Sequence, residues 1–104
     1  IKAELLPKYP HVDDVVGLLA TRVAEVDAVL REACPRWPLE RLAATDRAVL
    51  RGAVAELMAR PGTPVRVVLD EAIEIARRYG SAESGGFVNG VLDQVARRLR
   101  PGEL

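Results

Sequence analysis

The sequence predicts an all-α fold, a compact bundle of antiparallel helices, and three observations lead to this expectation. Apolar residues recur at spacings of three and four along four separate runs, which is the pattern of amphipathic helices. No segment alternates apolar and polar residues for long enough to indicate a strand. Proline and glycine separate the runs by connections of about two to seven residues, a length typical of packed antiparallel neighbours.

The first helix is expected over residues 12–30, where apolar side chains share one face. They are Val12, Val15, Val16, Leu19, Val23, Val26 and Leu30. The segment 34–38 carries two prolines and breaks the helical pattern, because proline removes an amide donor and restricts the residue before it. Trp37 in this loop is expected to be a buried hydrophobic plug, and Pro38 to open a short helix through Leu42.

The second helix is expected around residues 49–58, where six apolar residues follow the same spacing. They are Val49, Leu50, Ala53, Val54, Leu57 and Met58. Thr45 or Asp46 is a suitable N-cap, because a short polar side chain can accept a hydrogen bond from the first free amides. The helix is expected to stop at the Arg-Pro-Gly segment of residues 60–62.

The third helix is expected over residues 65–79, with Thr63 as its N-cap and Pro64 in its first turn. Its buried stripe comprises Val65, Val68, Leu69, Ala72, Ile73, Ala76 and Tyr79. Gly80 is expected to end it, because glycine is favoured directly after a helix. The carboxylates on this helix are interpreted as surface charges, since Glu74 lies four residues before Arg78, the favourable order for an ion pair.

The last helix is expected from Phe87 to Leu99, after a small polar connection over residues 81–86. Gly90 lies inside this helix, where glycine costs about 1 kcal/mol relative to alanine, so a close crossing with another helix is expected there. A second interpretation is that the start of this helix faces a ligand, because its first turn has free amide donors. Phe87, the only phenylalanine, is expected either to fill the core or to stack on an unpaired base.

The chain length and composition restrict the classes of function. Its 104 residues are expected to form one domain, 1–104, and 15 basic and 15 acidic residues give no net charge. A free-standing polyanion binder usually has a large positive excess, so any nucleic-acid binding must be local or shared. Cys34 and His11 are too few for a disulfide or a zinc site and lack a partner for catalysis, so we expect no metal, no cofactor and no catalytic residues. We expect a cytoplasmic protein without a membrane segment.

Three segments carry a resemblance to a known family. They are TDRAVLRGAVAEL from Thr45 to Leu57, TPVRVVLDEAIEIARRYG from Thr63 to Gly80 and SGGFVNGVLD from Ser84 to Asp93. Together with Trp37 and the following Leu-Glu-Arg, they resemble the bacterial transcription antitermination factor NusB in order and spacing. These segments cover about two-thirds of the chain.

The resemblance implies an all-helical, non-catalytic RNA-binding factor. Members of this family, together with the ribosomal protein NusE, bind the single-stranded boxA element of ribosomal-RNA transcripts and help RNA polymerase to read through terminators. Carried over by position, RNA contact is expected at Ser84, Gly86 and Phe87, with Arg77 and Arg78 as phosphate partners. Partner binding is expected at Asp46 and Arg47. The resemblance also matches four polar residues that we interpret as a network between helices: Arg51, Glu56, Glu71 and Asn89.

The sequence departs from the family pattern in three places. Family members begin with an arginine-rich helix that has no counterpart here, and the chain starts at Ile1 rather than methionine. We therefore expect an N-terminally truncated domain with weaker RNA affinity and an apolar groove that a second copy could close. Gly86 stands where a basic residue is common in the family, and Gly52 where an apolar residue is usual.

Two alternatives remain open from the sequence. The N-terminal domain of ribosomal-RNA cytosine methyltransferases also resembles NusB, which would make this chain part of an enzyme. Asp93 argues against this alternative, because that group tends to have arginine at this position. The other alternative is a helical interaction module that forms a homodimer and binds no RNA.

Overall fold

The computed structural model describes residues 12–103, which contain four α-helices, two short 3-10 turns and no strand. The helices are α2 (Val12–Ala33), α3 (Ala44–Ala59), α4 (Val65–Tyr79) and α5 (Ser84–Leu99). The 3-10 turns are η1 (Leu39–Arg41) and η2 (Pro101–Glu103). The predicted all-α fold is confirmed.

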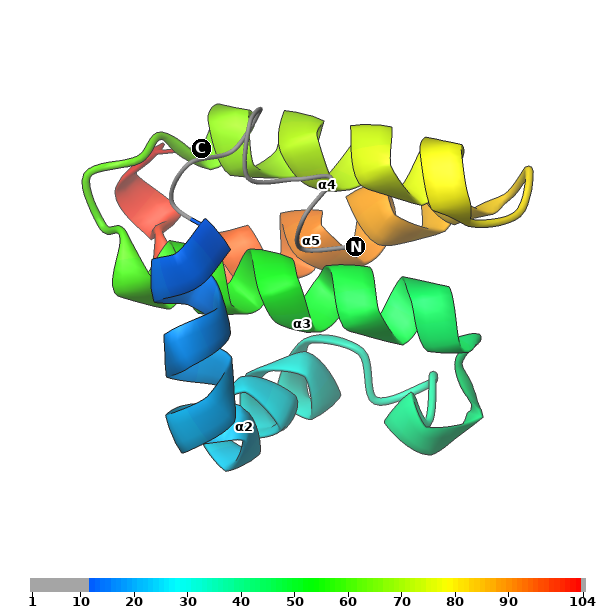
Figure 1. The fold of residues 1–104 in the computed structure, drawn as a ribbon, viewed down its shortest axis with the longest axis horizontal. Helices are drawn as coiled ribbons and strands as arrows, with labels where there is room; N and C mark the ends of the chain where they lie inside the picture. Colours follow the sequence, from blue (N-terminus) through cyan, green and yellow to red (C-terminus); the bar gives the residue numbers. More distant parts are fainter. Residues whose placement is uncertain (1–11, 104) are drawn as a thin grey trace.

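Helix α3 lies in the middle of the bundle and contacts α2, α4 and α5. Figure 1 shows α3, α4 and α5 side by side, with α4 running opposite to the other two, while the first half of α2 crosses them. The core between the helices is formed mainly by valine, leucine and alanine, and its fully buried side chains include Val26, Val54, Val68, Val88 and Leu92. The first three belong to the apolar runs that the sequence places on helix faces.

The helix α2 is kinked at Arg22, whose φ of −130° and ψ of 30° lie outside the helical range. Just before the kink, the Thr21 hydroxyl donates hydrogen bonds to the carbonyls of Gly17 (3.1 Å) and Leu18 (3.3 Å). Such a hydroxyl competes with backbone amides for these carbonyls, which bends helices. The kink rotates the following turn, so the prediction that Val23 is buried with Val26 is wrong: Val23 is 43% exposed.

The N-termini of α3 and α4 lack the predicted side-chain caps. Helix α3 begins one residue before Thr45, with Ala43 at its N-cap, so Thr45 and Asp46 lie inside the first turn. Helix α4 has Pro64 at its N-cap, and the amide of Val65 donates instead to Glu103 Oε2 at 2.9 Å. The cap of α4 therefore comes from a residue 38 positions away.

The turn between α4 and α5 requires glycine at position 80, whereas no close contact requires glycine at position 90 within α5. A Cβ built on Gly80 would lie 2.4 Å from Ser84 Oγ and 2.7 Å from the Ala76 carbonyl oxygen, so no side chain fits there. A Cβ on Gly90 would meet nothing within 4 Å. The expected helix crossing at Gly90 is therefore wrong, and this residue lies on an exposed part of α5.

Candidate nucleic-acid interface

The candidate interface is centred on the first turn of α5, which begins at Ser84 and not at Phe87 as predicted. The earlier start follows from hydrogen bonds within the turn: the amide of Ser84 donates to the Ser81 carbonyl (3.1 Å), and the amide of Ser81 donates to Ser84 Oγ (2.9 Å). Ser84 is 1% exposed. Its side chain therefore closes the turn and is buried there, and its assignment as an RNA contact stays a prediction.

Gly86 and Phe87 differ from Ser84 in being accessible. Gly86 is exposed, and a Cβ built on it would meet nothing within 4 Å. Phe87 is half-buried and packs against the core with part of its ring at the surface. Phe87 is therefore a core residue in part, as one expectation had it, and its stacking on an unpaired base stays a prediction.

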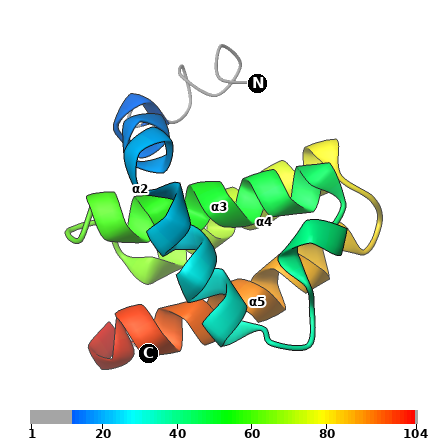
Figure 2. The ribbon, with the colours of Figure 1, turned by 90° about the horizontal axis from the view of Figure 1, so that it is seen from below.

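Trp37 lies against Phe87, with ring centroids 5.6 Å apart and an interplanar angle of 83°. This edge-to-face arrangement is one of the favourable geometries of aromatic pairs. Trp37 is 54% exposed, so the prediction that it is a buried plug is wrong. Figure 2 shows why it reaches Phe87: the connection from α2 to η1 runs beside the N-terminal half of α5.

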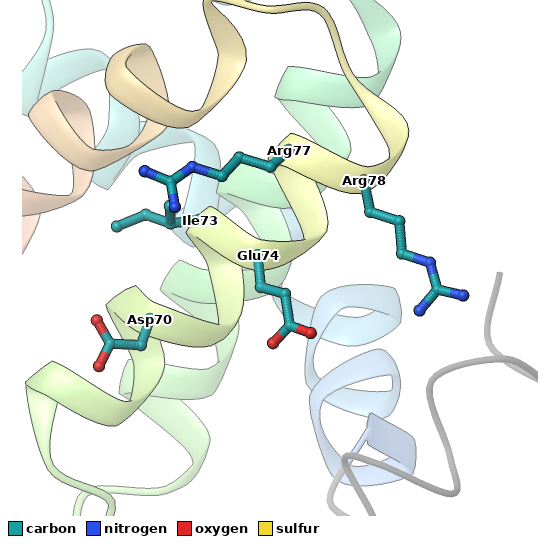
Figure 3. A pocket seen from close by; sticks show the side chains of 5 residues that line it. All are labelled: Asp70, Ile73, Glu74, Arg77 and Arg78. Atoms are coloured by element: carbon teal, nitrogen blue, oxygen red, sulfur yellow. The ribbon is translucent and has the colours of Figure 1, made fainter.

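Arg77 and Arg78 occupy the last turn of α4, and only Arg77 lies next to the start of α5. A Cβ on Gly85 would come within 3.0 Å of Arg77 Cγ and Nε, so the Arg77 side chain passes directly over that glycine. Arg78 extends in the other direction (Figure 3). Its guanidinium carbon lies 5.6 Å from the centroid of the Tyr79 ring. The structure therefore places Arg77 over Gly85 in the first turn of α5, whereas Arg78 points away from Arg77.

A shallow depression runs along the outer side of α4, and both arginines line it. Its other lining residues are Asp70, Ile73 and Glu74, all on the same helix (Figure 3). Two carboxylates and then two guanidiniums follow one another along this surface, and such a mixture of charges suits an exposed helix face better than a site for one charged ligand. The expected surface-charge role of these carboxylates fits the ion pair of Asp70 with Arg66, 3.1 Å apart.

Asp46 and Arg47, the predicted partner-binding residues, lie in the first turn of α3. Arg47 Nη1 donates to the carbonyls of Leu39, Glu40 and Leu42 at 3.4 to 3.5 Å, so its guanidinium closes the end of η1. Asp46 Oδ1 is buried and has no hydrogen-bond partner among the described residues. The Arg47 guanidinium is thus occupied by hydrogen bonds within the chain. The neighbouring surface of α3 is therefore the candidate site for partner binding.

The predicted polar network joins helices in two separate places. Arg51 on α3 makes two hydrogen bonds to Asp27 on α2, at 2.8 and 2.9 Å. Glu71 on α4 shares a hydrogen bond with Glu56 on α3, and burial together with the nearby Glu56 charge raises the pKa of Glu71 to about 8. The fourth predicted member does not belong to either pair, because Asn89 is exposed on α5.

The described residues supply no sign of metal or thiolate chemistry. Residues 12–103 contain no group of three or more histidine, cysteine or acidic side chains that could hold a metal ion. Burial raises the pKa of the Cys34 thiol, which opposes formation of the reactive thiolate. The other half of the cysteine and histidine pair, His11, lies outside the described residues. Within the described helices, none is both long and apolar enough to cross a membrane.

Trp37 belongs to the candidate interface although the sequence pattern predicts a core position for it. Large aromatic side chains are usually buried, which is the reason for that prediction. A signal was nevertheless present, since prolines at 35 and 38 bracket the residue and loops run over the surface.

Comparison with known proteins places these features in one family. The model of the NusB family matches residues 6–97. Two relatives named transcription antitermination protein NusB come from Sorangium cellulosum (strain So ce56), 54% identical over 86% of this chain, and from Koribacter versatilis (strain Ellin345), 49% identical over 83%. A solved structure described as T. maritima NusB superposes with a TM-score of 0.76 and 41% identity, covering 80% of this chain.

The matched regions are only part of those proteins. This chain spans 64% and 59% of the two relatives' lengths and 58% of the solved T. maritima chain.

Proposed function

We propose, from the premise that this chain belongs to the NusB family, that it is a non-catalytic transcription antitermination factor. In this proposal it binds boxA-type single-stranded RNA jointly with the ribosomal protein NusE, as part of the antitermination complex of RNA polymerase in the cytoplasm. The names of the relatives support the antitermination role directly. Binding to boxA-type RNA and to NusE goes beyond these names and is the more specific part of the proposal.

The observation that carries the RNA part is the position of Phe87. The residue is half-buried in the first turn of α5, next to the exposed Gly86 and in the same turn as Gly85, over which the Arg77 side chain passes. An aromatic face offers stacking to an unpaired base, and a guanidinium offers charge-assisted hydrogen bonds to its phosphate. Arg78 is the outer phosphate contact in this proposal, because it leaves α4 on the other side.

The joint binding with NusE follows from the charge of the chain. With 15 basic and 15 acidic residues, the chain has no positive excess to hold RNA at long range. A partner that binds the same RNA raises the effective concentration of the second contact, so two weak surfaces together bind tightly. We place the NusE contact on α3 near Asp46, where Arg47 fixes the adjoining η1 turn.

The test is a titration of a labelled boxA-type RNA, followed by fluorescence anisotropy, with and without NusE. We expect NusE to tighten binding and a scrambled RNA to bind more weakly than boxA. Equal affinity for the two RNAs would contradict the proposal. Light scattering on the same samples separates the RNA-binding monomer from a homodimer that binds no RNA.

Variants connect this titration to the site. Phe87→Leu keeps an apolar side chain against the core but removes the aromatic face, so it should weaken RNA binding while the fold remains intact. Arg77→Ala should weaken it as well, whereas Arg98→Ala, at the far end of α5, serves as the matched control. If the control variant lost as much affinity as Arg77→Ala, the proposed position of the RNA would be wrong.

A further inference from the structure

Trp37 is the one tryptophan of the chain, and more than half of its surface is open. The other large apolar residues that are exposed among the described residues are the much smaller Val23 and Val67. The exposed indole leaves a large apolar area in contact with water, which is unfavourable. Exposed apolar surface of this kind often marks a binding site.

The indole is held in a defined position. Its amide donates to the Cys34 carbonyl at 3.2 Å, which closes a tight turn, and Pro38 follows it directly. Its ring packs edge-to-face on Phe87 with a centroid distance of 5.6 Å. A side chain fixed by its backbone and by one neighbour loses little entropy when a ligand binds to its free surface.

The charges next to this aromatic pair favour a nucleic acid over an apolar peptide. Arg36 precedes Trp37, is exposed and forms no ion pair within the described part of the chain. Arg77 lies over Gly85, two residues before Phe87. Glu83 at the N-cap of α5 is the opposing charge at this end of the helix. An exposed guanidinium next to Trp37 in the sequence and a second one over the helix turn that contains Phe87 match an unpaired base with its flanking phosphates.

We propose that Trp37 and Phe87 form one stacking platform, in which the open surface of the Trp37 indole stacks on a base of a single-stranded RNA. The inference rests on the proposed function and deepens it, because it adds a contact from the loop between α2 and η1 to the surface at the start of α5. In this arrangement Arg36 and Arg77 contact the phosphates on either side of the stacked base.

The single tryptophan makes the contact directly observable. Its fluorescence is expected to be quenched as a boxA-type RNA is titrated in, with the same midpoint as the anisotropy of the labelled RNA. Replacing the nucleotides of that RNA one at a time by abasic ones should identify a position whose loss abolishes the quenching. If RNA binds by anisotropy while the fluorescence stays unchanged, the stacking inference is overturned and the proposed function survives. If no RNA binds, both are overturned.

Substitution of the indole gives an independent measure. Trp37→Ala should weaken RNA binding about five- to 150-fold, the range expected for one stacked base, and Trp37→Phe should restore most of it. Val67→Ala, which removes another exposed apolar side chain on α4, is the control and should leave the affinity unchanged. The losses from Trp37→Ala and from the critical abasic nucleotide should not add, because both remove the same contact.

The same variants decide between RNA and a protein partner. If Trp37→Ala leaves RNA affinity unchanged but weakens binding of NusE in the absence of RNA, the indole is a protein contact and the stacking inference is wrong. Circular dichroism of Trp37→Ala verifies the fold, and the abasic RNA series needs no protein variant at all.

Discussion

At the scale of single residues, burial decides the chemistry of the Glu56 and Glu71 pair. Glu56 is 7% exposed, and its carboxyl group shares a hydrogen bond with Glu71. Two carboxyl groups that share a hydrogen bond cannot both be charged without strong repulsion, so one of them keeps a proton. Desolvation and the neighbouring charge of Glu56 raise the pKa of Glu71 to about 8, and Glu71 is therefore protonated at neutral pH.

This pair predicts a pH-dependent stability. Because the pKa of Glu71 is about 8 in the folded protein and 4.5 as its ordinary value, the folded state binds more protons between these values. The free energy of unfolding should therefore decrease as the pH rises from about 5 to about 8. Glu71→Gln should flatten this part of the profile, as measured by thermal unfolding across the pH range. The exposed Glu83→Gln is the control, and an equally flat profile for it would contradict the assignment.

Glycine positions give a second prediction at this scale. Gly90 has free space around it on the exposed side of α5, so Gly90→Ala should stabilise the protein by about 0.5–1 kcal/mol through a lower backbone entropy in the unfolded chain. Gly80→Ala should destabilise it, because the new Cβ would collide with Ser84 Oγ. Urea unfolding measures both changes, and a loss of stability in Gly90→Ala would contradict the open environment.

At the scale of the helices, a C-terminal clip connects three elements of the bundle. Arg100, directly after α5, donates from Nη2 to the carbonyls of Leu57 and Arg60 (3.0 and 3.1 Å) at the end of α3. Its Nη1 donates to the Thr63 carbonyl and to Glu103. The Glu103 carboxylate in turn accepts from the first amide of α4. Residues 100 and 103 thus provide hydrogen-bond partners for backbone groups at the C-terminus of α3 and at the N-terminus of α4. Such groups at helix ends otherwise have no partner within the helix.

The clip predicts an effect far larger than that of a surface charge. The Arg100 side chain is 11% exposed, and Arg100→Ala would leave two partly buried carbonyls, those of Leu57 and Thr63, without this donor, in addition to the exposed carbonyl of Arg60. We expect a loss of about 1–3 kcal/mol in the free energy of unfolding. Arg98→Ala, two residues earlier and exposed, should change it by less than about 0.5 kcal/mol. Equal effects of the two variants in urea unfolding would contradict a role of the clip.

At the scale of the whole molecule, two pairs of arginines lie at helix ends rather than on one continuous face. Arg77 and Arg78 end α4, and Arg97 and Arg98 end α5. Arg97 is paired with Asp93 at 3.0 Å, so its charge is partly neutralised. The start of α5 lies beside the end of α4, as Figure 1 shows, and this is the end of the bundle that carries the proposed RNA surface. A small local positive region is consistent with affinity shared between two proteins.

This distribution predicts a weak salt dependence for the chain alone. Phosphate contacts from Arg36, Arg77 and Arg78 should give a slope of about −2.1 for the logarithm of the RNA binding constant against that of the salt concentration, because each single-strand contact contributes about −0.7. Addition of NusE should make the slope steeper. A slope beyond about −4 without NusE would require a much larger basic surface and would contradict the shared arrangement.

The sequence determined the helices and most of the core. Apolar spacing identified the buried faces of α3, α4 and α5, and proline and glycine marked their ends to within a few residues. These features are local, because helical periodicity and the residues that end a helix can be recognised from neighbouring positions in the sequence. The motifs of Thr45 to Leu57, Thr63 to Gly80 and Ser84 to Asp93 also indicated the family.

Which side chains meet and which stay exposed depends on how the helices pack against one another. The tertiary structure exposed Val23 through the kink at Arg22, brought Trp37 onto Phe87, and paired Glu56 with Glu71. It also capped α4 with Glu103 and required glycine at position 80 rather than at 90. Each of these outcomes depends on the relative placement of segments that are distant along the chain or separated by a bend, and helical periodicity specifies a face but not the residue that packs against it.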